Sequence, residues 1–329
     1  MSTLRGKRAL VTGGTGFVGS RLAARLADVE GASVVATGRN LDAVSHLEEL
    51  GVNLRRAHLL DFNSLREMLD GVDIVFHVAA WLSPRHGPPT DAWALNVYAS
   101  EKLARFAAAA NVARVVLVSS IAAYGPPSGE VIYEDTPLDT RQRSEYGRTK
   151  AEGELRAMEV ATQTGLELVV TRPGIVYGPG SYGWSRRMVR LVQRGVPVVF
   201  GGGAGHAHPV YIDNLVDGLV LAATKPQAPG EAFNFVDRPV PWREWFGHYG
   251  RMCGRTPRRL PLWLARLALL LAERLPLGLS INRNLLSHYT NRSIYAIDRA
   301  RDLLDYEPGV SLEEGMARTE AWLRQEQVL

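Results

Sequence analysis

Tyr146 and Lys150 are the residues of this chain whose types and spacing could perform acid–base chemistry. They stand four positions apart in SEYGRTKAEGE, a stretch with a helical pattern to about residue 161, so both side chains share one helix face. A tyrosine hydroxyl has an ordinary pKa of ~10 and exchanges protons near neutral pH only where a cation favours the phenolate. Lys150 can supply that charge, which predicts an acid–base pair. The spacing alone also permits a structural interpretation, in which Tyr146 faces the core and Lys150 extends its charged end to the surface.

A glycine-rich motif, GGTGFVGS, lies between a strand pattern at residues 8–12 and a helical pattern at residues 21–28. Gly13, Gly16 and Gly19 let the turn close tightly, bring backbone N–H groups up to a pyrophosphate and pack the helix on its strand. The helix N-terminus favours the negative charge. Since a second strand pattern follows at residues 33–37, the motif predicts a dinucleotide site. Three more residues of the turn are expected to contact the cofactor, namely Thr15, Phe17 and Val18.

The end of the second strand pattern reads TGRN. An NAD enzyme usually carries Asp or Glu here to hold the ribose hydroxyls. This chain has Gly38 at the position of that carboxylate. The next residue, Arg39, has a guanidinium that suits the 2′-phosphate of NADP in charge and geometry. The sequence therefore predicts NADP(H) in preference to NAD(H), although a surface arginine in a loop is the alternative.

Strand and helix patterns alternate along most of the chain. Further strands are expected at residues 53–57, 72–78, 114–118, 166–171 and 232–236. This alternation predicts an α/β fold with a doubly wound parallel sheet and with ligands at the carboxyl ends of its strands. We expect residues 1–174 to form a dinucleotide-binding domain whose sheet is completed by about residues 209–238. A smaller, mostly helical substrate domain is expected from residues 175–208 and 239–329.

The charge balance gives no sign of a nucleic-acid partner. The chain has 329 residues and a formal charge of +4, from 38 basic and 34 acidic residues, with no long block of like charge. A group of arginines in the C-terminal part is interpreted as a solvated face, namely Arg251, Arg255, Arg258 and Arg259.

Cysteine and histidine content argues against disulfides and metals. Cys253 is the single cysteine, which excludes an internal disulfide framework and favours a cytoplasmic setting. His206 and His208 lack companion ligands, so we expect no metal site. The first strand pattern begins at residue 8, so we also expect no signal peptide.

In order and spacing, TGGTGFVGS, Asp61, HVAA, Asn96, LVSSIAAYG, YGRTK and RPGIVYGPG resemble the extended short-chain dehydrogenase/reductase superfamily over nearly the whole chain. The motifs YGPG, HPVYIDNLVDGLVLA, PVPWREWF and RDLLDYEPGVSLEEGMART are similar to its 3β-hydroxysteroid dehydrogenase-like branch, within the NAD(P)-dependent epimerase/dehydratase enzymes. The resemblance implies a Rossmann fold and a catalytic set of Ser120, Tyr146 and Lys150. In that set Lys150 hydrogen-bonds the nicotinamide ribose and favours ionisation of Tyr146, while Ser120 aligns the substrate oxygen.

The resemblance also implies further cofactor contacts. Asp61 and Phe62 should lie near the adenine, Ala79 and Ala80 against the inner ribose and phosphates, and Pro173 with Ile175 near the nicotinamide. Ser119 should be structural or face the cofactor. Alternatively, Asp61 could cap the helix after it, and the alanines could be close-packed residues at a strand end.

These features predict an NADP-dependent oxidoreductase that reduces a ketone or oxidises a secondary alcohol on an apolar substrate. One alternative is a nucleotide-sugar epimerase or dehydratase with bound NAD. Ile175 and Ala207 disfavour it, because sugar-nucleotide enzymes of this superfamily usually have Asn and Arg at these positions to hold the diphosphate. A second alternative is a non-catalytic NADP sensor, which the intact catalytic set disfavours.

The most apolar segment, residues 262–275, carries its three charges on one narrow stripe. It could be a core helix, a lid over an apolar pocket or a weak peripheral membrane contact, but it is too short for a transmembrane span. Trp81, Ile175 and Ala207 favour the lid, because they would present apolar surface near the substrate. We also expect a homodimer through helices near residues 91–110 and 145–161, because the resemblance implies this pairing and the alanines at 107–110 permit close approach.

Overall fold

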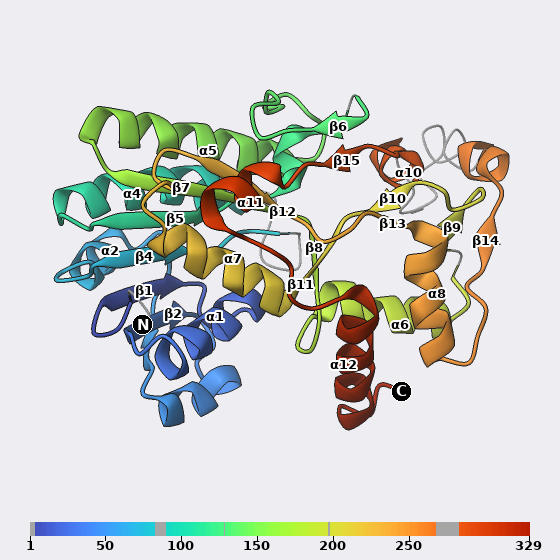
Figure 1. Ribbon diagram of the computed structural model, residues 1–329, viewed down its shortest axis with the longest axis horizontal. Helices are drawn as coiled ribbons and strands as arrows, with labels where there is room; N and C mark the ends of the chain where they lie inside the picture. The colour runs from blue at the N-terminus through green and yellow to red at the C-terminus, as the bar shows by residue number, and fades with distance from the viewer. Residues whose placement is uncertain (1–3, 83–89, 128, 197, 268–282) are drawn as a thin grey trace.

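The computed structural model describes residues 4–82, 90–127, 129–196, 198–267 and 283–329. At its centre lies a seven-stranded sheet with the order β12-β7-β5-β4-β1-β2-β3 (Figure 1). Every neighbouring pair of these strands is parallel, which confirms the predicted α/β fold. The strands are β1 (Arg8–Thr12), β2 (Ser33–Gly38), β3 (Asn53–Arg56), β4 (Ile74–His77), β5 (Arg114–Val118), β7 (Glu167–Pro173) and β12 (Ala232–Phe235).

Helices cover both faces of this sheet (Figure 1). On one face lie α1 (Phe17–Asp28) and α7 (Ile212–Thr224), and on the other lie α2 (Phe62–Met68), α4 (Ala99–Ala109) and α5 (Glu145–Thr164). Strand β1 is buried on both faces. Ala9 and Val11 pack into the core under α1 and α7, called the first core, and Leu10 between them packs into the core under α2, α4 and α5, called the second core. The sequence pattern of short continuous apolar runs is typical of strands buried on both faces.

Further helices and two-stranded pairs build the rest of the described molecule. The helices are η1 (Asp42–Leu50), α3 (Thr90–Trp93), η3 (Ala94–Tyr98), η4 (Ile121–Tyr124), η5 (Tyr182–Arg186), α6 (Arg187–Gln193), α8 (Trp242–Met252), α10 (Arg283–Thr290), α11 (Asp298–Leu304) and α12 (Leu312–Gln325). The pairs are β6 (Val131–Ile132) with β15 (Ile294–Tyr295), β8 (Ile175–Tyr177) with β11 (Pro209–Tyr211), β9 (Val199–Phe200) with β14 (Arg259–Leu260), and β10 (His206–Ala207) with β13 (Val240–Pro241).

The core under α1 and α7 continues into the C-terminal helices. One cluster of buried side chains contains Leu22 of α1, Leu215 of α7 and Trp245 of α8. Asn214 of α7 also joins the sheet side to the segment before α12. Its Nδ2 donates to Val310 O (2.9 Å), and its Oδ1 accepts from Val310 N (2.9 Å). The predicted boundaries near residues 174 and 239 therefore cross a shared core, and the division into two domains stays a prediction.

The apolar segment at 262–275 is described only as far as residue 267; its remainder lies outside the described residues. Residues 262–267 are helical, and Ala265 is buried against Phe200 and Leu286. Trp263 and Leu267 are 66% and 46% exposed. In the ranges that the structure describes, every helix is too short or too polar to span a bilayer.

Candidate active site

The predicted catalytic serine and tyrosine meet at the carboxyl end of β5. Ser120 follows this strand and caps η4, since its Oγ accepts a hydrogen bond from Ala122 N (3.1 Å). Tyr146 lies in the first turn of α5, and its hydroxyl hydrogen-bonds the Ser120 hydroxyl. Ser144 caps this helix by accepting from Gly147 N (3.2 Å). The local signals for a strand end and a helix start therefore place both hydroxyls at one point.

Gly147 allows α5 to lie directly against η4. An ideal Cβ at this glycine would lie 2.6 Å from Ala122 O and 2.4 Å from Gln142 Oε1, closer than real contacts permit. Gln142 holds the same loop, because its Nε2 donates to Ala122 O (2.9 Å). Sequence reasoning missed this role, and the available signal was a glycine directly after the tyrosine inside a helical pattern. A side chain at this position would push Tyr146 away from Ser120.

Lys150 is buried one turn further along α5. Its Nζ donates to Val118 O at the end of β5 (2.7 Å). Burial lowers the pKa of Lys150 to about 8, and the nearby Glu154 carboxylate opposes this change. Burial raises the pKa of Tyr146, whereas its hydrogen bond with Ser120 lowers it. Lys150 remains mostly protonated at neutral pH. The two influences on the pKa of Tyr146 are burial and Ser120, so a role of the lysine charge in ionising the tyrosine stays a prediction.

The glycine turn between β1 and α1 has the shape predicted for a phosphate cradle. Gly13 has a φ of +70°, and an ideal Cβ there would lie 2.7 Å from Ala79 Cα. An ideal Cβ at Gly19 would lie 2.2 Å from Gly13 O, so the helix can approach the turn only without a side chain. Gly16 is the N-cap residue of α1, and no side chain caps the helix. The turn therefore fits a dinucleotide pyrophosphate at the N-terminus of α1, with Ala79 of the β4 end beside it.

The remaining residues of the turn have defined positions. Phe17 and Val18 begin α1 and pack against the first core. The side chain of Thr15 fills the space beside Gly38, where an ideal Cβ would lie 2.0 Å from Thr15 Oγ1. A carboxylate residue at position 38 would thus collide with Thr15 in this arrangement.

Two arginines lie at the carboxyl end of β2 and β3. Arg39 is exposed, and its backbone oxygen accepts from Arg56 Nη1 (2.7 Å). Arg56 ends β3 and is paired with Gly38 in the sheet. Neither guanidinium forms an ion pair with a carboxylate of the described residues. This corner of the sheet therefore offers unpaired positive charge where the adenosine ribose of a dinucleotide would lie.

On the expected adenine side, the structure supports the capping role of Asp61. Its Oδ1 accepts from Ser64 N (3.2 Å) at the start of α2, as the alternative interpretation proposed. Phe62 packs edge-to-face on Phe106, with ring centroids 6.2 Å apart. Ala80 follows Ala79 and is partly exposed. These positions leave adenine contacts a prediction.

The expectation that Trp81, Ile175 and Ala207 present apolar surface to a substrate is wrong for this structure. They are only 3%, 6% and 0% exposed, and Ile175 and Ala207 belong to the first core. For Ile175 the reason is strand pairing, because Ile175 N donates to His208 O (2.7 Å) and β8 pairs with β11. Pro173 is also buried, at the end of β7. Contacts of Pro173 and Ile175 with a nicotinamide stay a prediction.

Ser119 and His77 are buried polar residues close to the catalytic groups. Ser119 N donates to Thr171 O (2.7 Å), while its Oγ has no hydrogen-bond partner in the described part of the chain. His77 was missed as a positioning residue although it stands in the HVAA motif. Its Nδ1 lies 2.7 Å from Thr12 Oγ1 and its Nε2 lies 3.1 Å from Ser100 Oγ, which ties β4 to β1 and α4. Burial, reinforced by the charge of Lys150, lowers the pKa of His77 to about 3, so this histidine is neutral.

His208, the second of the two histidines near residue 207, has structural partners. His208 Nε2 lies 2.8 Å from Ser293 O, and its ring packs on Tyr295 with centroids 4.7 Å apart. Burial lowers the pKa of His208 to about 4. The described residues contain no group of three or more His, Cys, Asp or Glu arranged to hold a metal ion.

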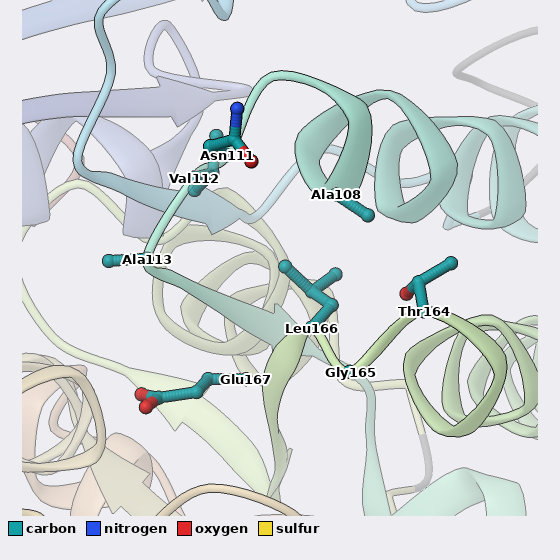
Figure 2. Close-up of a pocket in the computed structure, with 8 residues that line it drawn as sticks. All are labelled: Ala108, Asn111, Val112, Ala113, Thr164, Gly165, Leu166 and Glu167. Carbon is teal, nitrogen blue, oxygen red and sulfur yellow. The ribbon is translucent and has the colours of Figure 1, made fainter.

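A surface pocket lies at the opposite ends of the strands from the catalytic groups and is not part of this site. It is at the amino ends of β5 and β7, whereas the catalytic groups are at the carboxyl end of β5 (Figure 2). Glu167, which lines it, pairs with Arg114 at 2.7 Å. The lining residues are Ala108, Asn111, Val112, Ala113, Thr164, Gly165, Leu166 and Glu167.

Comparison with known proteins shows the family to which this chain belongs. Residues 9–235 match the model of the NAD dependent epimerase/dehydratase family. The chain is 28% identical to the 2-alkyl-3-oxoalkanoate reductase of Stenotrophomonas maltophilia, over 95% of this chain and 98% of that protein. It is 30% identical to the UDP-glucose 4-epimerase of Vibrio cholerae, over 70% of this chain and 71% of that protein.

A solved structure agrees with the fold. The structure of MoeE5 in complex with UDP-glucose and NAD superimposes with a TM-score of 0.77 at 27% identity, covering 97% of this chain and 99% of that one. Similarity thus extends to a reductase and to sugar-nucleotide enzymes, while the 3β-hydroxysteroid dehydrogenase-like branch stays a prediction.

Proposed function

The chain belongs to the NAD dependent epimerase/dehydratase family and is an extended short-chain dehydrogenase/reductase enzyme, and on this premise we propose that it is an NADP-dependent ketone reductase or secondary-alcohol dehydrogenase with an apolar substrate. The observation that carries the proposal is the residue pair Ile175 and Ala207. Both are buried apolar residues that form no substrate surface, and the amide and guanidinium that would hold a nucleotide diphosphate are absent from these positions. The match to a reductase along almost its whole length supports the same choice.

The residues of the site fit one reaction. NADPH, when bound, supplies the hydride. Tyr146 donates the proton to the substrate carbonyl oxygen, or accepts it from the alcohol in the reverse direction. Ser120 orients that oxygen through its hydroxyl, and Lys150 keeps a positive charge near the tyrosine. The turn from Gly13 to Gly19 would hold the cofactor pyrophosphate.

A series of ketones with increasing apolar size tests the proposal. Purified protein with NADPH is expected to oxidise the cofactor, and kcat/KM should rise by up to about fourfold per buried methylene. Loss of nicotinamide absorbance reports the reaction. Conversion of UDP-glucose without ketone reduction would establish the epimerase alternative. Cofactor binding with unchanged absorbance for every substrate would establish the sensor.

The NADP preference predicts a selective loss in Arg39→Ala. A charge-assisted contact with the 2′-phosphate is worth on the order of 1.5–3 kcal/mol, so affinity for NADPH should fall ~10-fold or more while affinity for NADH barely changes. Titration with each cofactor measures both constants. Arg55→Ala is the matched control. Arg56 contacts Arg39, and successive strand residues point to opposite faces, so Arg55 should lie away from the ribose site. Equal losses for the two cofactors would show that Arg39 does not read the phosphate.

We also propose a homodimer through α4 and α5. Tyr98 beside α4 and Leu155 of α5 are 47% and 44% exposed, and Arg156 lies over the ring of Tyr98 at 5.8 Å. Burying these apolar side chains between two copies would remove them from water. Sedimentation velocity at micromolar protein should give a dimer, and Leu155→Glu should give a monomer. A monomeric parent protein contradicts the proposal.

A further inference from the structure

Positive charge is concentrated at one end of the molecule. Residues 182–212 contain four arginines and no acidic residue, and residues 239–267 contain six arginines and one acid, Glu244. Glu244 is itself paired with Arg238 at 2.6 Å. These segments form α6, α8, β9 and β14, and the last three lie at the end of the molecule farthest from β1 and β2 (Figure 1). These segments of a nearly neutral chain therefore carry an excess of positive charge, although Arg186 pairs with Glu326 after α12 (2.9 Å).

Backbone and side-chain contacts bring several of these arginines together. Arg255 Nη1 donates to Gln193 O at the end of α6 (2.7 Å). The Arg258 guanidinium lies over Gly195, with Nε 3.1 Å from its ideal Cβ, and β14, which contains Arg259, pairs with β9. Arg194, Arg255, Arg258 and Arg259 are exposed, and none forms an ion pair with a carboxylate of the described residues. Many surface arginines elsewhere do form ion pairs; Arg324, for example, pairs with Glu320 at 2.6 Å.

The same segments also carry exposed apolar side chains. In the helical turns 262–267, Ala265 faces inward, so Trp263 and Leu267, which are four positions apart, share the outward face. They are 66% and 46% exposed, and Arg266 between them is also exposed. Val196, after α6, is 40% exposed. Burying Trp263 and Leu267 would remove a large apolar area from water.

We propose that this surface, the docking face formed by Arg194, Val196, Arg258, Arg259, Trp263 and Leu267, binds an anionic lipid bilayer. Arginines are attracted to negatively charged headgroups, and a tryptophan prefers the boundary between headgroups and acyl chains. Leu267 and Val196 would enter the apolar layer beside it. A nucleic-acid phosphate backbone would satisfy the arginines and leave these aliphatic side chains exposed, so the combination favours lipid.

Vesicle co-sedimentation of the full chain tests the proposal without any substrate. The protein should bind vesicles of phosphatidylglycerol and phosphatidylcholine in equal parts, bind phosphatidylcholine alone far more weakly, and lose affinity as salt is raised. Each arginine near the surface contributes roughly a fivefold change in partitioning, so Trp263→Ser/Arg259→Gln should lose at least about tenfold. Ketone reduction in solution should be unchanged in this variant.

A matched control removes one exposed apolar residue and one arginine elsewhere. Val29→Ser/Arg5→Gln does so on the dinucleotide-binding side, where Val29 is 56% exposed, and should bind vesicles as the parent does. Equal loss in both variants would overturn the docking face, as would binding to neutral vesicles as strong as to anionic ones. Binding to duplex DNA without binding to anionic vesicles would assign the arginines to another partner. Because these readouts need no turnover, they stand or fall separately from the proposed reaction.

Discussion

Replacing Tyr146 by phenylalanine is expected to lower kcat by roughly 10²- to 10⁴-fold, the range for loss of a positioned acid–base group. The substitution removes only the hydroxyl that meets Ser120 and leaves the ring that packs in the first turn of α5. Stability and cofactor binding should therefore change little. Steady-state turnover with NADPH and the best ketone of the series measures the effect, and fluorescence titration measures cofactor affinity.

Tyr133→Phe is the matched control, since Tyr133 is 51% exposed and lies near β6 rather than at the catalytic end of α5. Its turnover should equal that of the parent enzyme. Near-normal turnover of Tyr146→Phe would remove this tyrosine from the mechanism. A variant that had lost both turnover and NADPH binding would instead show that the hydroxyl supports the cofactor site.

Replacing Glu154 by glutamine is expected to cost about 3–5 kcal/mol of unfolding free energy, because it leaves a buried guanidinium without its counter-charge. Arg172 and Glu154 are 4% and 1% exposed, and Arg172 Nε donates to Glu154 Oε1 at 3.0 Å. Arg172 Nη1 also donates to Tyr124 Oη (2.6 Å) and to Glu134 O (2.7 Å). Burial alone would lower the pKa of Arg172, yet the Glu154 carboxylate raises it above its ordinary value. The pair therefore depends on both members.

Urea unfolding compares this variant with two others. Glu320→Gln breaks the exposed pair with Arg324 and should change the unfolding free energy by ~0.5 kcal/mol or less. Glu154→Leu/Arg172→Leu removes both charges and should recover part of the lost stability. A midpoint for Glu154→Gln equal to that of the parent would contradict the assigned role. Since α5 carries Tyr146, Lys150 and Glu154, turnover of any folded fraction should also fall.

Features fixed by neighbouring residues could be predicted from the sequence. Strands β1 and β5 have the expected bounds, because each is a short apolar run ended by polar or glycine residues. The glycine turn has the expected shape, because Gly13 needs a positive φ and Gly19 needs a close approach. The Tyr146 helix begins where Ser144 caps it.

Features that depend on distant segments could not be predicted. The burial of Ile175 follows from its pairing with β11, which no local pattern reveals. The Arg172 network joins α5, β7 and η4 with the loop at Glu134, and Tyr124 Oη continues it to Asn234 Oδ1 (2.8 Å). Its members look like ordinary surface residues in the sequence, since charged side chains are rarely buried unless paired.

The strand order has a consequence for synthesis on the ribosome. With the order β12-β7-β5-β4-β1-β2-β3, β1 emerges first, and every later strand pairs with an edge of the sheet already made. No strand has to be inserted between two others, so the sheet can grow outward as the chain emerges. The two edges differ: β3 ends with exposed Arg55 and Arg56, whereas β5 is apolar and nearly all buried. Until β7 is made, the nascent chain therefore presents an apolar edge that can pair with other chains, and this is the stage at which a chaperone would protect it best.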